Sequence, residues 1–210
     1  FINNLPNGRD TTAFDTEDAS GSTSQAAGVV EAMEAGTSLL LIDEDTSATN
    51  FMVRDELMQR VIRRNMEPIT PLIDRVREIY ERYGISTIIV AGSSGAYFHI
   101  ADRIIQMDRY VPRDITALAK REAQAFPMHS EPLPPAETPA FDRRPKASPE
   151  LCGDRAKLKA LGRDGVSVNR ETIDLRYVEQ LIDSEQTAAL GYCMLYAQKH
   201  LLDGRRTLRQ

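Results

Sequence analysis

Four consecutive apolar residues, Leu39 to Ile42, run straight into the carboxylates of Asp43 and Glu44. A short, continuously apolar run is typical of a strand buried on both faces of a parallel sheet. At the end of such a strand, Asp43 can hold Mg²⁺ through water, and Glu44 can orient or deprotonate a water that attacks a phosphate. Taken alone, an apolar strand ending in Asp-Glu is more often structural.

Helices and strands are predicted to alternate around this run. Helical spacing spans residues 25–35 and stops at Gly36, and a second amphipathic pattern over 72–83 precedes a predicted strand at 86–91. A third apolar stretch, 103–107, continues the alternation. The order predicts an α/β fold, with a parallel sheet flanked by helices. Further helices are predicted at 51–64 and 114–126.

Prolines mark a change of organisation after this first part. Seven of the eleven prolines lie in 127–149, and neither helical nor strand periodicity survives there. We therefore predict an α/β domain over 1–126, a Pro-rich linker over 127–149 and a small α+β extension over 150–210. Within the extension, we expect short extended pieces between 166 and 182. A helix capped by Asp183 or Ser184 should run to about Leu202 and end at Gly204.

The composition is that of an ordinary globular protein, with a net charge of −5. Residues 1–102 carry 8 basic and 16 acidic side chains, or −8, whereas residues 103–210 carry 18 and 15, or +3. No apolar run approaches the roughly 20 residues of a membrane span. Because the chain opens at Phe1, without a signal peptide, we expect a cytoplasmic fragment with no membrane partner. Cys152 and Cys193 are predicted to be unpaired thiols.

Polar segments flank the helix–strand unit on both sides. The segment Asp18–Gln25 (DASGSTSQ) leads into the helix, where small residues and free amides favour phosphate oxygens. An ordinary serine-rich helix cap explains the same pattern. After the two acids, the turn Asp45–Asn50 (DTSATN) leads into the next predicted helix.

The order of these motifs resembles the ABC-type ATPase domain. SGSTSQ stands where the family's signature is found, LLLIDED where its Walker B strand is found, and SATN where its D-loop is found; ADRIIQMD is similar to its closing stretch. Together with AGSSGAYF, the set resembles the stand-alone, soluble predicted ATPases of the ABC class. The resemblance is close over about 1–126, and the tail is also similar to that group's extension.

The resemblance implies a partial P-loop NTPase fold and a chemistry of ATP binding and hydrolysis. It makes Asp43 the carboxylate that holds Mg²⁺ through water and Glu44 the catalytic base. Such domains act as head-to-tail homodimers around ATP, which gives two further implied groups of residues. Nucleotide binding falls to Ser20, Gly21, Ser22 and Gln25, and contact across the dimer falls to Ser47 and Asn50.

Two departures from the family pattern are visible. Gly92, Ser93 and Ser94 stand where a switch histidine is usual, so γ-phosphate sensing falls to a serine hydroxyl or an amide. His99, His129 and His200 are interpreted as structural or surface residues.

The second departure is that no GxxxxGK[ST] motif occurs in the chain. Without this loop there is no lysine for the phosphates, so we expect a phosphate loop upstream and no hydrolysis by this fragment alone.

Two other functions stay open from the sequence. One is an ATP-gated RNA-binding or regulatory protein with little or no hydrolysis, which would use the basic C-terminal half. The other is a structural α/β module that has kept the motifs as relics.

Overall fold

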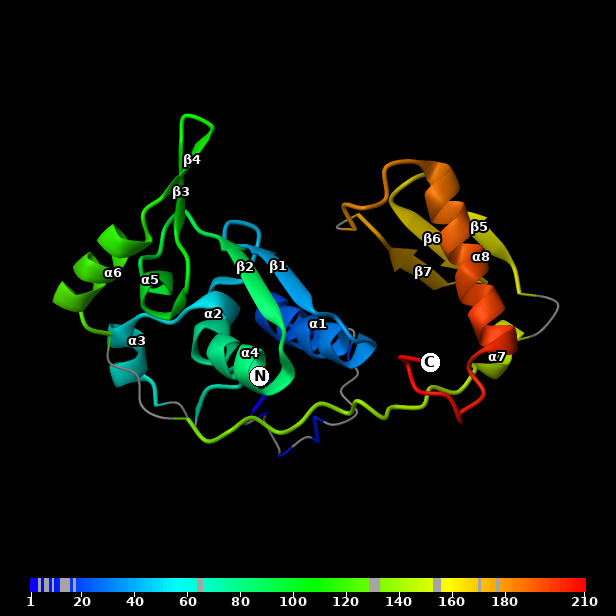
Figure 1. Cartoon of the computed structure of the whole chain (residues 1–210). Coiled ribbons are helices and arrows are strands. Elements are labelled where there is room, and N and C mark those ends of the chain that lie inside the picture. The colour runs from blue at the N-terminus through cyan, green and yellow to red at the C-terminus, as the bar shows by residue number, and fades with distance from the viewer. Residues whose placement is uncertain are drawn as a thin grey trace. The chain divides into compact units, whose positions relative to one another are not determined.

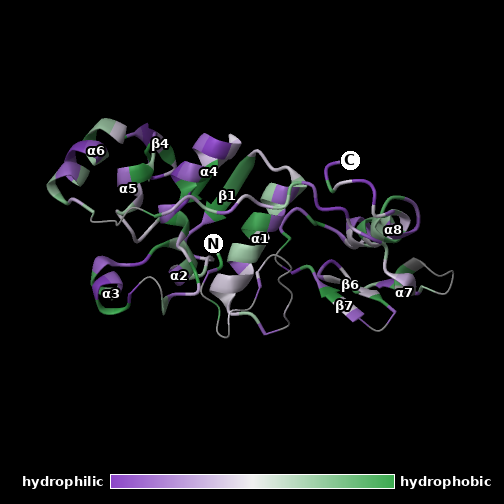
Figure 2. Ribbon diagram, turned by 90° about the horizontal axis from the view of Figure 1, so that it is seen from below, coloured by the Kyte–Doolittle hydropathy of each residue, from purple (hydrophilic) through white to green (hydrophobic). Residues whose placement is uncertain are grey.

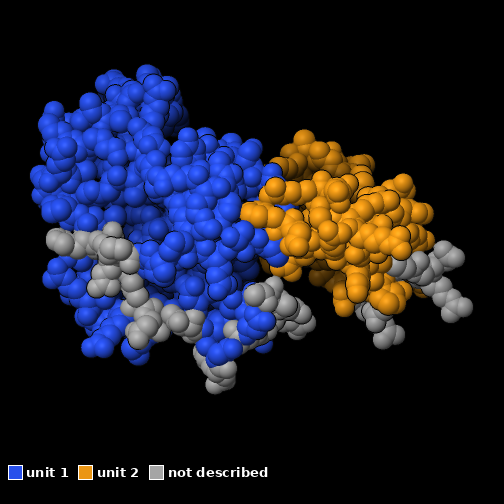
Figure 3. Space-filling view, turned by 60° about the horizontal axis from the view of Figure 1, so that its bottom comes forward, with its two compact units in different colours: residues 1–140 blue, residues 141–210 orange. Residues whose placement is uncertain are grey.

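The computed structural model describes residues 1–210 except 4, 6, 7, 9, 12–15, 17, 64, 65, 129–132, 153–155, 170 and 177, and describes only the backbone of 150 and 152. The chain forms two compact units, Phe1–Ala140 and Phe141–Gln210 (Figure 3). Their boundary lies inside the stretch 127–149.

The first unit mixes helices with short strands (Figure 1). In chain order its elements are α1 Gly21–Ala35, β1 Leu39–Asp43, α2 Thr49–Met52, α3 Glu56–Val61, the 3-10 helix η3 Leu72–Asp74, α4 Val76–Tyr83, β2 Ser86–Val90, α5 Tyr97–Ile100, β3 Ile105–Asp108, β4 Val111–Asp114 and α6 Thr116–Ala125.

Helix α1 follows from local sequence signals at both ends. Ser20 caps its start by accepting a hydrogen bond from a backbone amide of the first turn. Gly36 ends it in the left-handed conformation, with φ 96°, as the sequence predicts. Ala26, Val29 and Met33 are buried at helical spacing. The helix begins at Gly21, four residues before the predicted start.

The predicted parallel sheet is present, and within the described residues it contains two strands. β1 pairs with β2 in parallel, with Leu40 opposite Thr87 and Ile42 opposite Ile89. Leu40 is buried on the covered face. The predicted α/β class is thus observed as a mixed α/β unit with small sheets.

The other face of this pair is apolar and exposed. Its members alternate along each strand with buried or half-buried residues: Leu39 and Leu41 are 42% and 72% exposed, and Ile88 and Val90 are 56% and 66% exposed. Figure 2 shows the apolar colour along β1. Parallel sheets are normally covered on both faces, so this face is unusual.

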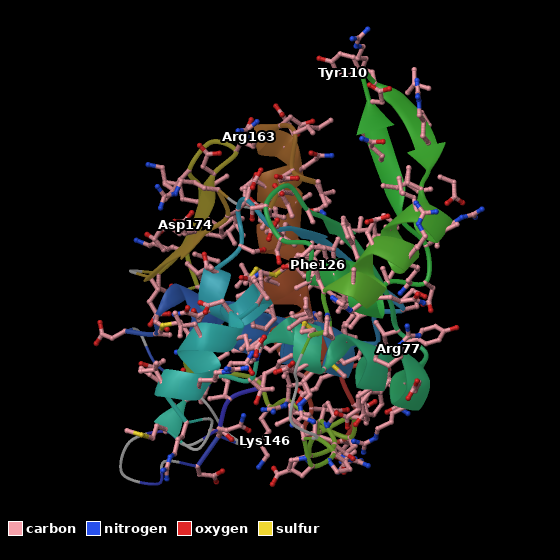
Figure 4. The ribbon with its side chains drawn as sticks, turned by 90° about the vertical axis from the view of Figure 1, so that its left-hand side faces the viewer. Arg77, Tyr110, Phe126, Lys146, Arg163 and Asp174 are labelled. Carbon is pink, nitrogen blue, oxygen red and sulfur yellow. The ribbon has the colours of Figure 1, made fainter. Side chains whose placement is uncertain are left out.

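The third predicted strand does not join the parallel pair. β3 instead pairs with β4 in an antiparallel hairpin, so the expectation of a third parallel strand is wrong. The hairpin turns through Arg109 and Tyr110, whose φ angles of 49° and 68° both lie in the left-handed region. Two such residues make a tight turn that matches strand twist. Tyr110 stands at the tip of the hairpin (Figure 4).

The predicted helix over 51–64 is divided in two. The backbone becomes extended at Val53, and the Asp55 carboxylate then accepts a hydrogen bond from the Met58 amide at 2.9 Å. Asp55 therefore caps a separate helix, α3. The pattern over 72–83 is likewise divided into η3 and α4, and Gly84 ends α4 in the left-handed conformation as predicted.

Residues 133–140, here called the strap, are bound to the first unit. Three charged side chains of the η3–α4 region hold it, namely Arg75, Glu78 and Arg82, and the buried Glu34 of α1 holds its end. The yellow-green strap passes below α4 in Figure 1. The hydrogen bonds run from Arg75 Nη1 to Pro134 O (2.7 Å), from Arg82 Nη1 to Ala136 O (2.7 Å), from Ala136 N to Glu78 Oε1 (2.8 Å) and from Ala140 N to Glu34 Oε1 (3.1 Å).

The second unit is a small α+β structure. Its elements are α7 Pro149–Cys152, β5 Leu158–Ala160, β6 Gly165–Val168, β7 Glu171–Asp174 and α8 Ser184–His200, and the strands form an antiparallel sheet in the order β5-β6-β7. Asp183 caps α8 with a reciprocal capping box, as predicted. The helix ends before Leu201, so Gly204 does not terminate it.

A glycine brings α8 close to this sheet. A Cβ atom at Gly191 would lie 2.7 Å from Leu158 Cδ1 and 3.1 Å from Val166 Cγ1. Cys193, on the same helix, is a free and exposed thiol. The side chain of Cys152 lies outside the described residues.

Candidate active site

Asp43 and Glu44 lie at the carboxyl end of the parallel strand pair. Asp43 is the last residue of β1 and stands opposite Val90, the last residue of β2. The Glu44 amide then donates a hydrogen bond to the Val90 carbonyl at 2.9 Å. The two acids therefore lie beside the loop that leaves β2.

Main-chain amides of that loop hold the Glu44 side chain. Glu44 Oε2 accepts hydrogen bonds from Gly92 N at 2.9 Å and from Ser93 N at 3.0 Å. Partial burial alone would raise the pKa of Glu44, but the Ser93 and Gly92 amides, the Ser93 hydroxyl and the Ser94 amide together hold it below its usual value. Glu44 is therefore a stabilised anion in this conformation.

Asp43 is exposed and turns toward its own loop. Its Oδ1 accepts from Asp45 N, and its Oδ2 accepts from the Thr46 hydroxyl, both at 3.2 Å. Each oxygen keeps a further lone pair, and Mg²⁺ is commonly bound through one or two carboxylates, waters and phosphate oxygens. Asp43 therefore fits a Mg²⁺ ion that reaches it through water. No cluster of three His, Cys, Asp or Glu side chains with metal-binding geometry occurs among the described residues.

Gln25 joins α1 to the loop that follows the acids. Its Nε2 donates to the Ser47 hydroxyl, and its Oε1 accepts from the Ala48 amide, each at 2.8 Å. The side chains predicted for nucleotide binding and for dimer contact are thus bonded to each other within one chain. The link fixes the start of α1 relative to the loop after β1.

The turn Ser20–Ser22 packs at the same place. Ser20 Oγ accepts from Thr23 N at 3.3 Å and lies 3.0 Å from the Thr23 hydroxyl, which is the geometry of an ordinary helix cap. A Cβ atom at Gly21 would lie 3.8 Å from Ala48 Cβ. Ser20 and Gly21 are exposed and Ser22 is half-buried, so their predicted contact with a nucleotide stays a prediction. Asn50, on α2, is also exposed.

Two of the three predicted switch residues contact Glu44, and their predicted role stays untested. Gly92 and Ser93 bind Glu44, whereas Ser94 Oγ accepts from Ala96 N at 3.3 Å and shapes the loop itself. Ser94 and Ala96 also border a cavity of about 230 Å³. Its wall further includes Arg54, Asp55, Gln59 and Asp74. Sequence spacing gave no sign of this cavity, because its wall comes from separate segments.

Two of the three histidines, His99 and His200, lie in the described part of the chain. His99 lies on α5, and its carbonyl accepts from Lys120 Nζ at 3.1 Å. The ring of His200 packs against Tyr196 at the end of α8, with centroids 4.7 Å apart. His129 lies outside the described residues.

Tyr97 is a residue of this site that the sequence did not single out. It follows the switch loop at the start of α5 and is 5% exposed. Burial and, second, the charge of Glu44 raise the pKa of Tyr97 to about 12. Its only sequence signal is its place in AGSSGAYF, five residues after Gly92.

The fold and the site define a mixed α/β protein with acidic groups at the end of a parallel strand pair. Residues 1–144 match the family model of the ABC ATPase P-loop domain, and the chain belongs to that family. Residues 157–210 match the model of the MRB1590 C-terminal domain. No curated protein matches the chain. In the described part of the chain, we found no helix long and apolar enough to cross a membrane.

Proposed function

We propose that this chain carries the water-activating half of an ATPase site. The observation that carries the proposal is the joint position of Asp43 and Glu44 at the end of the β1–β2 pair, beside a loop whose amides bind Glu44. Membership of a P-loop ATPase family supplies the nucleotide chemistry. The only observation in favour of the RNA-binding alternative is the small excess of basic over acidic side chains in residues 103–210.

The roles follow from where each acid lies. Asp43, which is exposed and keeps free lone pairs, would hold Mg²⁺ through water, and such an ion would supply positive charge to the phosphate oxygens. Glu44 orients the attacking water and accepts its proton. The loop Gly92–Ser94 responds to the γ-phosphate. Because the Gly92 and Ser93 amides hold Glu44, a movement of this loop would reach the carboxylate.

The phosphate loop of the same site is proposed to lie outside these 210 residues. The chain contains no Gly-Lys pair to cradle the phosphates. The exposed apolar face of Leu41, Ile88 and Val90 supports this, since an α/β segment that brings a phosphate loop would also cover it. By itself, the chain is expected not to hydrolyse ATP.

A head-to-tail homodimer completes the proposal. Ser20, Gly21 and Ser22 face a nucleotide held by the partner subunit, and Ser47 and Asn50 lie at the same interface. The exposure of Ser20, Gly21 and Asn50 leaves them accessible to such a partner. The bond from Gln25 to Ser47 would transmit a change at the interface to the loop beside Glu44.

Steady-state hydrolysis of Mg-ATP by a full polypeptide that includes the phosphate loop tests the proposal. Glu44→Gln should lower turnover at least about 100-fold while leaving ATP-dependent dimerisation intact. Asp45→Asn is the matched control, because Asp45 is an exposed acid on the same loop. Unchanged turnover in Glu44→Gln would remove the hydrolytic proposal.

A further inference from the structure

Tyr97 holds a polar atom that the fold does not use. The side chain is buried at the start of α5, and its hydroxyl has no hydrogen-bond partner among the described residues. A buried hydroxyl without a partner destabilises a protein, because the group has lost its hydrogen bonds to water. Such a group therefore calls for a role in another state of the protein.

The position of Tyr97 indicates what that role is. Tyr97 directly follows the loop whose amides at Gly92 and Ser93 bind Glu44. Its phenol is protonated at neutral pH and able to donate, and burial and, second, the charge of Glu44 raise its pKa to about 12. Other buried atoms without a hydrogen-bond partner among the described residues include Arg54 Nε, Arg75 Nε and Thr87 Oγ1, but none of these belongs to the segment that binds Glu44.

The observed bonding of Glu44 shows why another donor is needed. Both loop amides bind one oxygen, Oε2, and hold the carboxylate toward the loop. To turn toward an attacking water, Glu44 has to give up some of these bonds. A carboxylate that does so needs a different donor to keep its orientation.

We propose that Tyr97 is the positioning residue for Glu44, and that its hydroxyl donates a hydrogen bond to the Glu44 carboxylate when the Gly92–Ser93 amides release it. The inference rests on the proposed ATPase function. The exchange moves Glu44 from a loop-bound to a tyrosine-bound arrangement without leaving its charge unsatisfied. It also gives a use to a hydroxyl that costs stability in the state observed here.

The substitution Tyr97→Phe tests this, because it removes the hydroxyl and keeps the ring. The measurements are kcat and KM for Mg-ATP and the melting temperature, in a full polypeptide that includes the phosphate loop. We expect kcat to fall about tenfold or more, from loss of a hydrogen bond to a charged group, with KM unchanged. The melting temperature should stay the same or rise, since the variant no longer buries an unpartnered hydroxyl. Tyr80→Phe, at an exposed tyrosine of α4, is the matched control and should change neither quantity.

Each other result overturns the inference. Wild-type kcat in Tyr97→Phe would show that the hydroxyl has no part in turnover. A fall in melting temperature would show that it stabilises the fold instead. Parallel assay of Glu44→Gln separates the two proposals: an inactive Glu44→Gln with a fully active Tyr97→Phe removes only the role of Tyr97. An active Glu44→Gln removes the ATPase proposal and this inference with it.

Discussion

Glu44 and Glu78 are two stabilised carboxylates of the first unit, and the structure holds them by different means. Glu44 accepts from main-chain amides of a short loop, at 2.9 and 3.0 Å. Glu78 accepts from Arg75 at 2.7 Å, from Arg82 at 2.5 Å and from the amide of Ala136.

Because of this difference, Glu44 can leave its hydrogen-bond donors, whereas Glu78 cannot. A loop amide can leave Glu44 with a small backbone rotation and no unpaired charge on the donor. The guanidinium groups around Glu78 lie on neighbouring turns of one helix region and also bind the strap, so releasing Glu78 would leave charges unpaired. Glu78 is therefore structural, and a helix rather than a loop fixes it.

The largest stability change should come from Glu78→Ala. It removes three hydrogen bonds and leaves Arg75, which is 7% exposed, without its carboxylate. We expect the free energy of unfolding of the first unit to fall by about 3 kcal/mol, measured by chemical denaturation. ATP turnover per folded molecule should be unchanged in the full polypeptide. A large loss of turnover would contradict the assignment of Glu78 to structure alone.

Gln25→Ala should have a smaller effect on stability and a clear one on activity. It removes both hydrogen bonds between α1 and the loop at Ser47 and Ala48. The expected loss is about 2 kcal/mol in the free energy of unfolding, together with reduced turnover because the loop beside Glu44 is no longer fixed. Gln25→Glu retains the length and one acceptor, so it should restore part of the stability. Wild-type turnover in Gln25→Ala would show that the link is not needed.

Arg82→Ala tests the strap itself. It removes the bonds from Arg82 to Glu78, to the Ala136 carbonyl and to Thr138. We expect a lower melting temperature, by less than for Glu78→Ala, and faster proteolysis within residues 133–140. Arg77→Ala is the control on the same helix, since Arg77 instead binds Asp102 and the Ile100 carbonyl. Equal cleavage in both variants would contradict the docking of the strap.

The smallest effect should be on how the free energy of unfolding depends on pH in the acidic range. The pKa of Glu78 in the folded protein is lowered from its ordinary value of 4.5; burial opposes this, but the hydrogen bonds from Arg82, Ala136 and Arg75 outweigh it. The stabilisation is therefore complete above about pH 4.5 and is lost as the pH falls through the lowered pKa. The difference in stability between wild type and Glu78→Gln should shrink below pH 4.5. A constant difference from pH 7 to pH 3 would rule out this linkage.

Local signals let the sequence predict much of the first unit. The stops at Gly36 and Gly84 and the apolar strand that ends at Asp43 each act within a few residues. The motif order further predicted Gly92, Ser93 and Ser94 as switch residues that sense the γ-phosphate, and that role stays a prediction. The contact of Gly92 and Ser93 with Glu44 was not predicted and is a finding of the structure.

Choices between distant partners could not be predicted in the same way. The pairing of β3 with β4 depends on the tight turn at Arg109 and Tyr110, which are residues without a turn signature. Docking of the strap depends on charges about 60 residues away, such as Arg75 bound to Pro134. The burial of Tyr97 is likewise a property of packing and not of spacing.

The most direct test of the account is the rate of γ-phosphate cleavage in a single turnover, with Glu44→Gln preloaded with ATP and started by Mg²⁺. The rate measured in this way does not include the steps of nucleotide binding and product release. The account predicts that the variant retains ATP and cleaves it at least about 100-fold more slowly than wild type and Asp45→Asn. Cleavage at the wild-type rate would contradict the claim that the carboxylate at the end of β1 activates water.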